Sequence, residues 1–114
     1  MKEFVLIFRN SKDAHDHPSP AQLQERMNWM AGVAARNLLV DKGNRLSVTG
    51  AKTVKPNNLV TDGPYTEIEE FITGYMLLKA ASIEDAVAIA QENPMIKMGG
   101  NIEIREVLAI PGKK

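Results

Sequence analysis

Asp62 stands in the turn sequence Asp62-Gly63-Pro64-Tyr65, directly before a strand-like apolar run. A carboxylate that faces a cleft can act as a general acid or base, so Asp62 is the first candidate catalytic residue. The same turn has a structural explanation, because Asp accepts hydrogen bonds from nearby backbone amides and Pro presets a turn. The residue types favour this structural interpretation, with catalysis by Asp62 as the alternative.

His15 and His17 flank Asp16 in a polar segment. A His-x-His pair can in principle hold a metal, but the sequence offers no third ligand nearby, so no metal site is predicted. One of these histidines could instead fold over a pocket and shuttle protons, which makes both of them candidate catalytic residues. The more ordinary interpretation is a solvated loop.

Arg9, Tyr75, Glu103 and Arg105 lie in segments that we expect to form strands. Their side chains could project into one cleft, where arginine would suit an anionic substrate. Salt bridging at a sheet edge is equally compatible with these residue types. Trp29, the single tryptophan, either borders the seam between a helix and the sheet or contacts a partner, and packing is favoured.

The size and charge of the chain exclude several classes of protein. Its 114 residues suit one domain, residues 1–114, with a core of its own. Apolar residues make up 44% and charged residues 25%, which is typical of a folded globular protein. Fourteen Lys and Arg balance fourteen Asp and Glu, so the basic surface that direct nucleic-acid binding requires is not expected.

The missing residue types and motifs narrow the chemistry further. The chain has no cysteine, which excludes disulfides, thiolate metal sites and a cysteine nucleophile, and agrees with a cytoplasmic location. The first ten residues contain too few apolar positions for a signal peptide or a membrane span, so no membrane association is expected. No phosphate-binding glycine loop, nucleophile elbow or His-Glu-x-x-His motif occurs, and we expect no cofactor.

The residues before position 45 predict a strand and a helix. Residues 3–9 form a short aromatic and β-branched run that predicts a strand with two apolar faces. Ser19, Pro20 and Gln22 then give a capping box with proline at the first helical position. Asn37 is a plausible left-handed stop for this helix. The apolar stripe expected to pack on the sheet is Leu23, Met27, Met30, Ala34 and Leu38.

The second half of the chain predicts a hairpin, two strands and a helix. Residues 45–63 alternate weakly and contain turn residues at positions 56–58, which predicts a hairpin toward the edge of the sheet. Residues 71–80 predict a central strand, again apolar on both faces. A helix is expected from Ser82 to Pro94, and a last strand over residues 101–110.

This order of elements predicts an α+β, ferredoxin-like antiparallel sheet with two helices on one face. Two helices can cover only one side of such a sheet, yet its first and central strands are apolar on both sides. A bare apolar face is unfavourable in water, and a second copy of the chain is the simplest cover. The sequence therefore predicts a homodimer with a pocket between or beside the facing sheets.

Several segments resemble the YCII-related family, specifically its DGPF subgroup, with Tyr65 where Phe is usual. They are TDGPYTEIEEFITGYMLLKA, SIEDAVAIAQENP and GGNIEIREV, together with MKEFVLIFR, SPAQLQERMNWM and GNRLS, and they span nearly the whole chain. The resemblance implies a ferredoxin-like fold that dimerises as an α/β-barrel-like unit. It also makes Asp62 the signature aspartate of the subgroup.

The resemblance leaves two functions open. Some YCII-like relatives are enzymes, including a dehydrochlorinating lyase of aromatic degradation, and a His-Asp pair is the suspected active centre of the wider family. The first hypothesis is thus a homodimer that binds a small molecule or performs acid/base chemistry of lyase or isomerase type near the Asp-Gly-Pro-Tyr loop. The second is a non-catalytic interaction module, because DGPF proteins are associated with sigma factors. The candidate residues of the first hypothesis are Asp62, His15 and His17 for catalysis and Arg9, Tyr65, Tyr75 and Arg105 for substrate binding.

Overall fold

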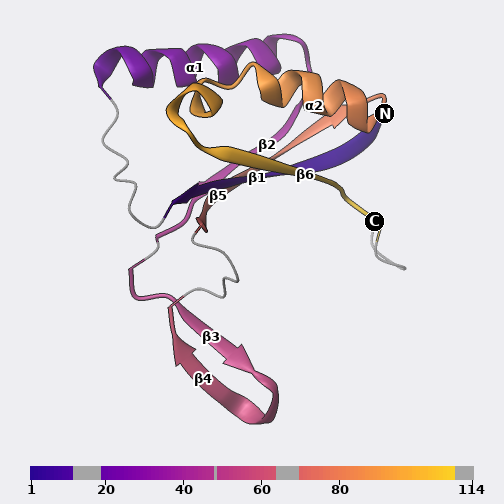
Figure 1. Ribbon diagram of the computed structural model, residues 1–114. Coiled ribbons are helices and arrows are strands. Elements are labelled where there is room, and N and C mark those ends of the chain that lie inside the picture. The colour runs from indigo at the N-terminus through magenta and orange to yellow at the C-terminus, as the bar shows by residue number, and fades with distance from the viewer. Residues whose placement is uncertain (12–18, 48, 64–69, 110–114) are drawn as a thin grey trace.

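A four-stranded antiparallel sheet and two helices form the body of the protein in the part that the structure describes (Figure 1). The structure is a computed structural model, and it describes residues 1–11, 19–47, 49–63 and 70–109. The sheet strands are β1 (Lys2–Ser11), β2 (Leu39–Arg45), β5 (Glu70–Ala80) and β6 (Asn101–Glu106), in the spatial order β2-β5-β1-β6. The helices are α1 (Pro20–Ala35) and α2 (Ile83–Gln91). The predicted α+β, ferredoxin-like class is confirmed.

Helix α1 begins and ends where its sequence signals predict. The Ser19 Oγ accepts a hydrogen bond from the Gln22 N–H at 3.1 Å, and the Gln22 Oε1 accepts one from the Ser19 N–H at 2.8 Å. At the other end Asn37 adopts φ 58°, and the Leu38 N–H donates to the Val33 carbonyl at 3.1 Å. These bonds satisfy backbone groups that a helix end leaves open, so the capping box and the left-handed stop are both confirmed.

The packed face of α1 differs from the predicted apolar stripe. Val33 is fully buried, and Trp29, Met30 and Leu38 pack against the core beside it. Three members of the predicted stripe are exposed instead: Leu23, Met27 and Ala34. Two overlapping sets of residues satisfy helical spacing, and they differ by a rotation of about 100° around the helix axis, the angle of one residue. The sheet buries the set that contains Trp29 and Val33.

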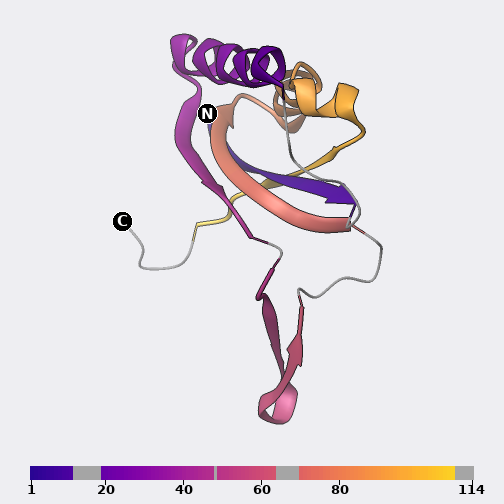
Figure 2. The ribbon, with the colours of Figure 1, turned by 90° about the vertical axis from the view of Figure 1, so that its left-hand side faces the viewer.

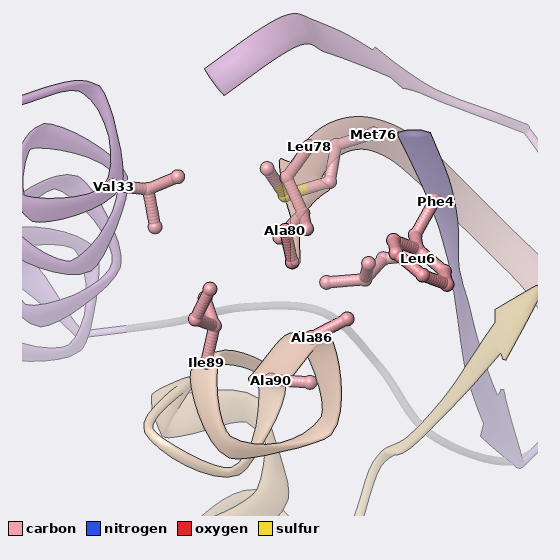
Figure 3. Close-up of a cluster of buried hydrophobic side chains, with 9 residues drawn as sticks. All are labelled: Phe4, Leu6, Val33, Met76, Leu78, Ala80, Ala86, Ile89 and Ala90. Carbon is pink, nitrogen blue, oxygen red and sulfur yellow. The ribbon is translucent and has the colours of Figure 1, made fainter. Parts of the chain in front are cut away.

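The core lies between the helices and one face of the sheet (Figure 3). Its buried members are Phe4 and Leu6 of β1, Met76, Leu78 and Ala80 of β5, Val33 of α1, and Ala86, Ile89 and Ala90 of α2. The Trp29 Nε1–H donates to the Ile89 carbonyl at 3.0 Å and so joins α1 to the end of α2. Packing of Trp29 in the helix–sheet seam is therefore confirmed. Neither helix in the described part of the chain has the length and apolarity needed to cross a bilayer.

The other face of the sheet is left open by the elements that the structure describes (Figure 2). Because side chains alternate along a strand, Val5 and Ile7 of β1 point away from the helices, as does Leu77 of β5. In the sheet register Val5 pairs with Leu77, and Ile7 pairs with Tyr75, so these side chains lie together on the open face. The expectation that both central strands are apolar on two sides holds.

The hairpin forms where it is predicted but does not join the main sheet. Strands β3 (Lys52–Lys55) and β4 (Leu59–Asp62) pair with each other around the short helix η1 (Pro56–Asn58), and they form a separate two-stranded sheet. One edge of the main sheet is instead β2, a strand that the sequence did not predict. The hairpin extends away from the body, and the radius of gyration is 15.6 Å against about 13 Å for a compact chain of this length.

We expect loss of the α1 cap to lower stability modestly. Ser19→Ala removes the acceptor for the Gln22 N–H and the partner of the capping box, so unfolding in urea should require about 1 kcal/mol less free energy. Gln22→Glu is the matched control, because a glutamate at this position keeps the box and places an acidic group at the helix start. A Ser19→Ala protein with unchanged stability would contradict the importance of this cap.

Candidate functional site

A cavity of about 320 Å³ lies between α1 and the helix-facing side of the sheet. Phe8 of β1 and Gly74 of β5 line it from the sheet, and Trp29 and Met30 line it from the helix. Met95, in the short helix η2 (Pro94–Met98), closes one side. The cavity thus has apolar and aromatic groups on opposite walls.

The polar side chains around this cavity come from segments far apart in sequence. Asn10 of β1, Thr73 of β5 and Asn93 after α2 all line it. Asn93 is buried, and its Oδ1 accepts a hydrogen bond from the Met95 N–H at 2.8 Å, which fixes the start of η2. A few polar groups converging on an apolar cavity are typical of small-molecule sites.

Among the described residues, the charged ones that line the cavity are all cationic. Arg26 reaches it from α1, where its Nη2 also donates to the Met98 Sδ at 3.7 Å. Lys42 and Arg45 reach it from β2, and both are exposed to solvent. The described lining thus includes three cationic residues.

A bulge in β2 brings four consecutive residues to the cavity. The register pairs Asp41 with Leu77 and Asn44 with Tyr75, so β2 takes three steps where β5 takes two. The extra residue is accommodated at Gly43, which has φ 72° and whose N–H donates to the Asp41 Oδ1 at 2.8 Å. Bulges often redirect side chains beside functional sites, and here residues 42–45 all line the cavity.

The structure places Asp62 at the base of the hairpin and not among the residues that line the cavity. Its carboxylate is 91% exposed and accepts a hydrogen bond from the Lys52 Nζ across the hairpin. The next residue, Gly63, donates its N–H to the Ala51 carbonyl at 2.6 Å and accepts from the Thr53 Oγ1 at 2.9 Å. In the single chain these contacts give the start of the Asp-Gly-Pro turn a structural role in closing the hairpin.

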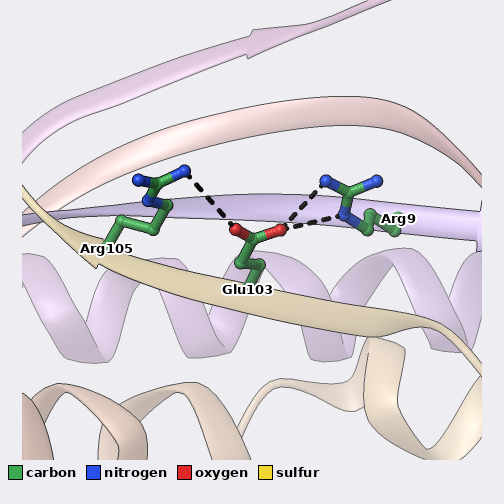
Figure 4. A network of polar contacts seen from close by, with 3 residues as sticks. All are labelled: Arg9, Glu103 and Arg105. Carbon is green, nitrogen blue, oxygen red and sulfur yellow. Dashed lines mark hydrogen bonds and ion pairs between the residues drawn. The ribbon is translucent and has the colours of Figure 1, made fainter. Parts of the chain in front are cut away.

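Arg9, Glu103 and Arg105 come together on the open face of the sheet (Figure 4). The Arg9 Nε and Nη2 donate to one Glu103 oxygen at 3.2 and 2.9 Å, and the Arg105 Nη1 lies 3.9 Å from the other. These are the salt bridges that the sequence left as an alternative. The Tyr75 side chain lies on this same face, because Tyr75 and Glu103 both pair with Ile7 in the sheet register.

Three predicted site residues, His15, His17 and Tyr65, lie outside the described residues. Within the described ranges no group of three or more His, Cys, Asp or Glu side chains is placed to hold a metal ion.

A comparison with protein families identifies the family of this chain. A sequence model of the YCII-related domain matches residues 4–111. The chain belongs to the YCII-related family. No curated protein matches it. The matched residues include all four strands of the main sheet, whose order is ferredoxin-like, and both helices.

The cavity of this YCII-related protein contains residues that sequence reasoning did not select. Arg26 occupies the packed side of α1 near Trp29, a position that a purely apolar stripe overlooks. Lys42 and Arg45 flank Gly43, and a glycine inside a strand-like run is a known indication of a bulge. That glycine was the available signal, because it marks the place where β2 changes register.

Proposed function

We propose that this YCII-related protein binds an organic small molecule in the cavity between α1 and the sheet. The observation that carries the proposal is the cavity itself, about 320 Å³ in volume, with apolar walls and convergent polar side chains. Ligand sites in proteins begin at about 300 Å³, so the volume suits a compact ligand such as a single substituted ring. Phe8, Trp29 and Met30 supply its apolar contacts.

Acid/base chemistry of lyase or isomerase type is the extended form of this proposal. It needs a proton-transfer group beside the ligand, within hydrogen-bonding reach. In the single chain the Asp62 carboxylate is paired with Lys52 on the hairpin, so its participation would depend on a partner copy that brings a hairpin to the cavity. Tyr75 offers a phenol on the open face of the sheet, where a partner copy would lie, and its hydroxyl accepts a hydrogen bond from the Asn44 Nδ2 at 3.1 Å.

The proposal includes a homodimer formed through the open face of the sheet. Val5, Ile7 and Leu77 give this face an apolar centre that no described element covers. In both views of the ribbon the helices and the β3–β4 hairpin lie on opposite sides of the sheet (Figure 1 and Figure 2). A second copy placed against the open face would therefore also meet the hairpin.

The hairpin is the observation that favours the second candidate function, a protein-interaction module for a partner such as a sigma factor. Three apolar side chains of the hairpin are largely exposed: Val54 (69%), Leu59 (57%) and Val60 (53%). Val54 and Val60 are paired across the two strands, yet both stay exposed. An isolated two-stranded hairpin is marginally stable alone, so an apolar partner would stabilise it. The homodimer uses the same hairpin without invoking another protein, and we prefer it.

Trp29 provides a direct test of binding, because it is the only tryptophan of the chain and lines the cavity. A panel of single-ring fragments, charged and uncharged, should include members that shift Trp29 fluorescence saturably and raise the melting temperature. Met30→Ala should weaken that binding by roughly tenfold, since it removes an apolar wall of the cavity.

Met27→Ala is the matched control for this experiment. Met27 lies on the same helix one turn away, is 64% exposed, and does not line the cavity, so its replacement should leave affinity unchanged. If no fragment changes either Trp29 fluorescence or the melting temperature, the proposed function is wrong. Equal losses in the two variants would place binding elsewhere.

A further inference from the structure

We infer that the ligand carries a neutral carboxamide-type group, a carbonyl beside an N–H, which the side chains of Asn93 and Asn10 bind at one end of the cavity. The inference rests on the proposed binding function and adds the chemical class of the ligand. Asn93 and Asn10 come from opposite halves of the chain, and both line the cavity. Neither side chain is charged, so the match that they require is one of hydrogen-bond donors and acceptors.

Asn93 presents a buried hydrogen-bond donor to the cavity. Only 8% of the residue is exposed, and its Oδ1 already accepts the Met95 N–H at 2.8 Å. The hydrogen bonds of the described residues leave the Asn93 Nδ2 without an acceptor. This nitrogen is not among the fully enclosed polar atoms of the described chain, so it has open space beside it, and the cavity is that space. A carbonyl oxygen of a ligand would satisfy such a donor.

Asn10 lies at the same end of the cavity. A Cβ at Gly100 would be 3.0 Å from the Asn10 Oδ1 and 2.6 Å from the Met95 Cγ, so these two side chains approach each other across the glycine. The Gly100 N–H also donates to the carbonyl of Met95, in the helix η2 that Asn93 caps, at 3.1 Å. No hydrogen bond among the described residues engages the Asn10 side chain, which leaves its oxygen and its NH2 group for a ligand.

The oxygens at this end favour a ligand group that also donates. Thr73 stands beside Asn10, because it is the extra β5 residue opposite Phe8 and Arg9. Its hydroxyl donates to the Phe8 carbonyl at 3.4 Å, so the Oγ1 is left as an acceptor. A carboxamide can donate to this oxygen and to the Asn10 Oδ1 while its own carbonyl oxygen accepts from Asn93. A carboxylate or a ketone has no proton to donate and leaves these acceptors unmatched.

The rest of the ligand meets apolar walls. The Trp29 Nε1–H is already donated to the Ile89 carbonyl at 3.0 Å, so Trp29 offers the ligand its ring and not its N–H. Phe8 and Met30 extend these walls. A carboxamide on a single ring therefore suits the whole cavity, with its polar group against the two amides and its ring against the aromatic side chains.

Benzamide, acetophenone and benzoate test this assignment, because all three join one ring to a carbonyl carbon and they differ in hydrogen-bond donors and in charge. Each is titrated into isotope-labelled protein, and the NMR signal of the indole N–H of Trp29, the only tryptophan, reports binding. We expect benzamide to bind at least about tenfold more tightly than acetophenone or benzoate, since only benzamide can donate to the acceptors at the polar end.

Two variants distinguish the roles of the two amides. Asn93→Ser keeps an oxygen that can cap η2 and removes the NH2 group, so it should weaken benzamide and acetophenone alike by about tenfold. Asn10→Ala should weaken benzamide by about tenfold and leave acetophenone unchanged, because Asn10 accepts the N–H of the ligand. Asn28 is an exposed residue of α1 outside the cavity, so Asn28→Ser is the matched control and should change neither affinity.

The outcomes separate the carboxamide inference from the binding proposal. If acetophenone or benzoate binds as tightly as benzamide, the inference fails and the binding proposal stands. Unchanged benzamide affinity in an Asn10→Ala protein with the wild-type melting temperature would also overturn the inference, whether or not Asn93→Ser folds. If no fragment of any kind binds, both the inference and the proposed function are wrong.

Discussion

Replacing Gly43 with alanine is expected to lower the free energy of unfolding by about 2 to 5 kcal/mol, since two penalties add. Gly43 has φ 72°, a conformation that disfavours residues with a Cβ. A Cβ at this position would also lie 1.7 Å from the Tyr75 carbonyl oxygen and 2.6 Å from its carbon. Backbone atoms of the central strand β5 cannot move aside cheaply, so β2 must separate from β5 or lose its bulge. Urea unfolding followed by circular dichroism measures the loss.

Gly50→Ala is the matched control, because it isolates the conformational penalty from the steric one. Gly50 has the same φ of 72°, but a Cβ there would meet nothing within 4 Å. Its replacement should therefore cost only about 1 kcal/mol. Equal effects of Gly43→Ala and Gly50→Ala would mean that the close approach of β2 to β5 does not limit stability.

Gly43→Ala should also weaken ligand binding at the cavity. The bulge is what brings residues 42–45 to the cavity, so a folded Gly43→Ala protein should bind the fragments that shift Trp29 fluorescence more weakly than the wild type. Gly50→Ala should bind normally, since Gly50 lies outside the cavity. Stability and affinity thus depend on one backbone feature.

Local signals in the sequence were sufficient for the ends of α1 and for the two central strands. Ser19 with Gln22, and Asn37 with Leu38, satisfy helix-end groups through contacts between neighbours in sequence, so their pattern is readable without the fold. The long apolar run of β5 also predicts a strand without knowledge of the fold. A strand with two apolar faces appears in the sequence as a continuous apolar run and not as an alternation of apolar and polar residues.

The packed side of α1 and the strand β2 depend on contacts that the sequence does not display. Helical spacing admits either Met27 or Trp29 as a core residue, and the position of the sheet decides between them. Leu39, the first residue of β2, packs against the core. Asp41 and Gly43 then interrupt the alternation of apolar and polar residues that would identify a strand. A bulged edge strand of this kind lacks the period that identifies a strand.

Sequence motifs point to Asp62 and not to the cavity. The Asp-Gly-Pro turn is conspicuous because its residues are adjacent, and its described part contacts the hairpin. The cavity is assembled from β1, α1, β2, β5 and the segment after α2, and each contributes residues of ordinary type. The side chains of the predicted binding residues that the structure describes, Arg9, Tyr75 and Arg105, lie on the open face instead.

Replacing Leu77 with lysine is expected to abolish the proposed homodimer and to leave the fold intact. Leu77 lies on the open face between Val5 and its other strand neighbour, Asp41. In a single subunit a lysine there can reach solvent and has the Asp41 carboxylate across the strand pair, so the melting temperature should change little. In a dimer whose sheets face each other, the ammonium would be buried, which costs several kcal/mol and should raise the dissociation constant by about 100-fold or more.

Sedimentation velocity of the wild type and of Leu77→Lys over a concentration series measures this effect. Leu78→Ala is the matched control, because Leu78 is the next residue of β5 and is fully buried on the helix side. Leu78→Ala should cost about 2 to 5 kcal/mol in unfolding free energy through the cavity it leaves. It should nevertheless remain dimeric where it is folded, since the open face is untouched. A wild-type protein that sediments as a lone subunit at micromolar concentration, or a Leu77→Lys protein that stays dimeric, would show that the open face is not the interface.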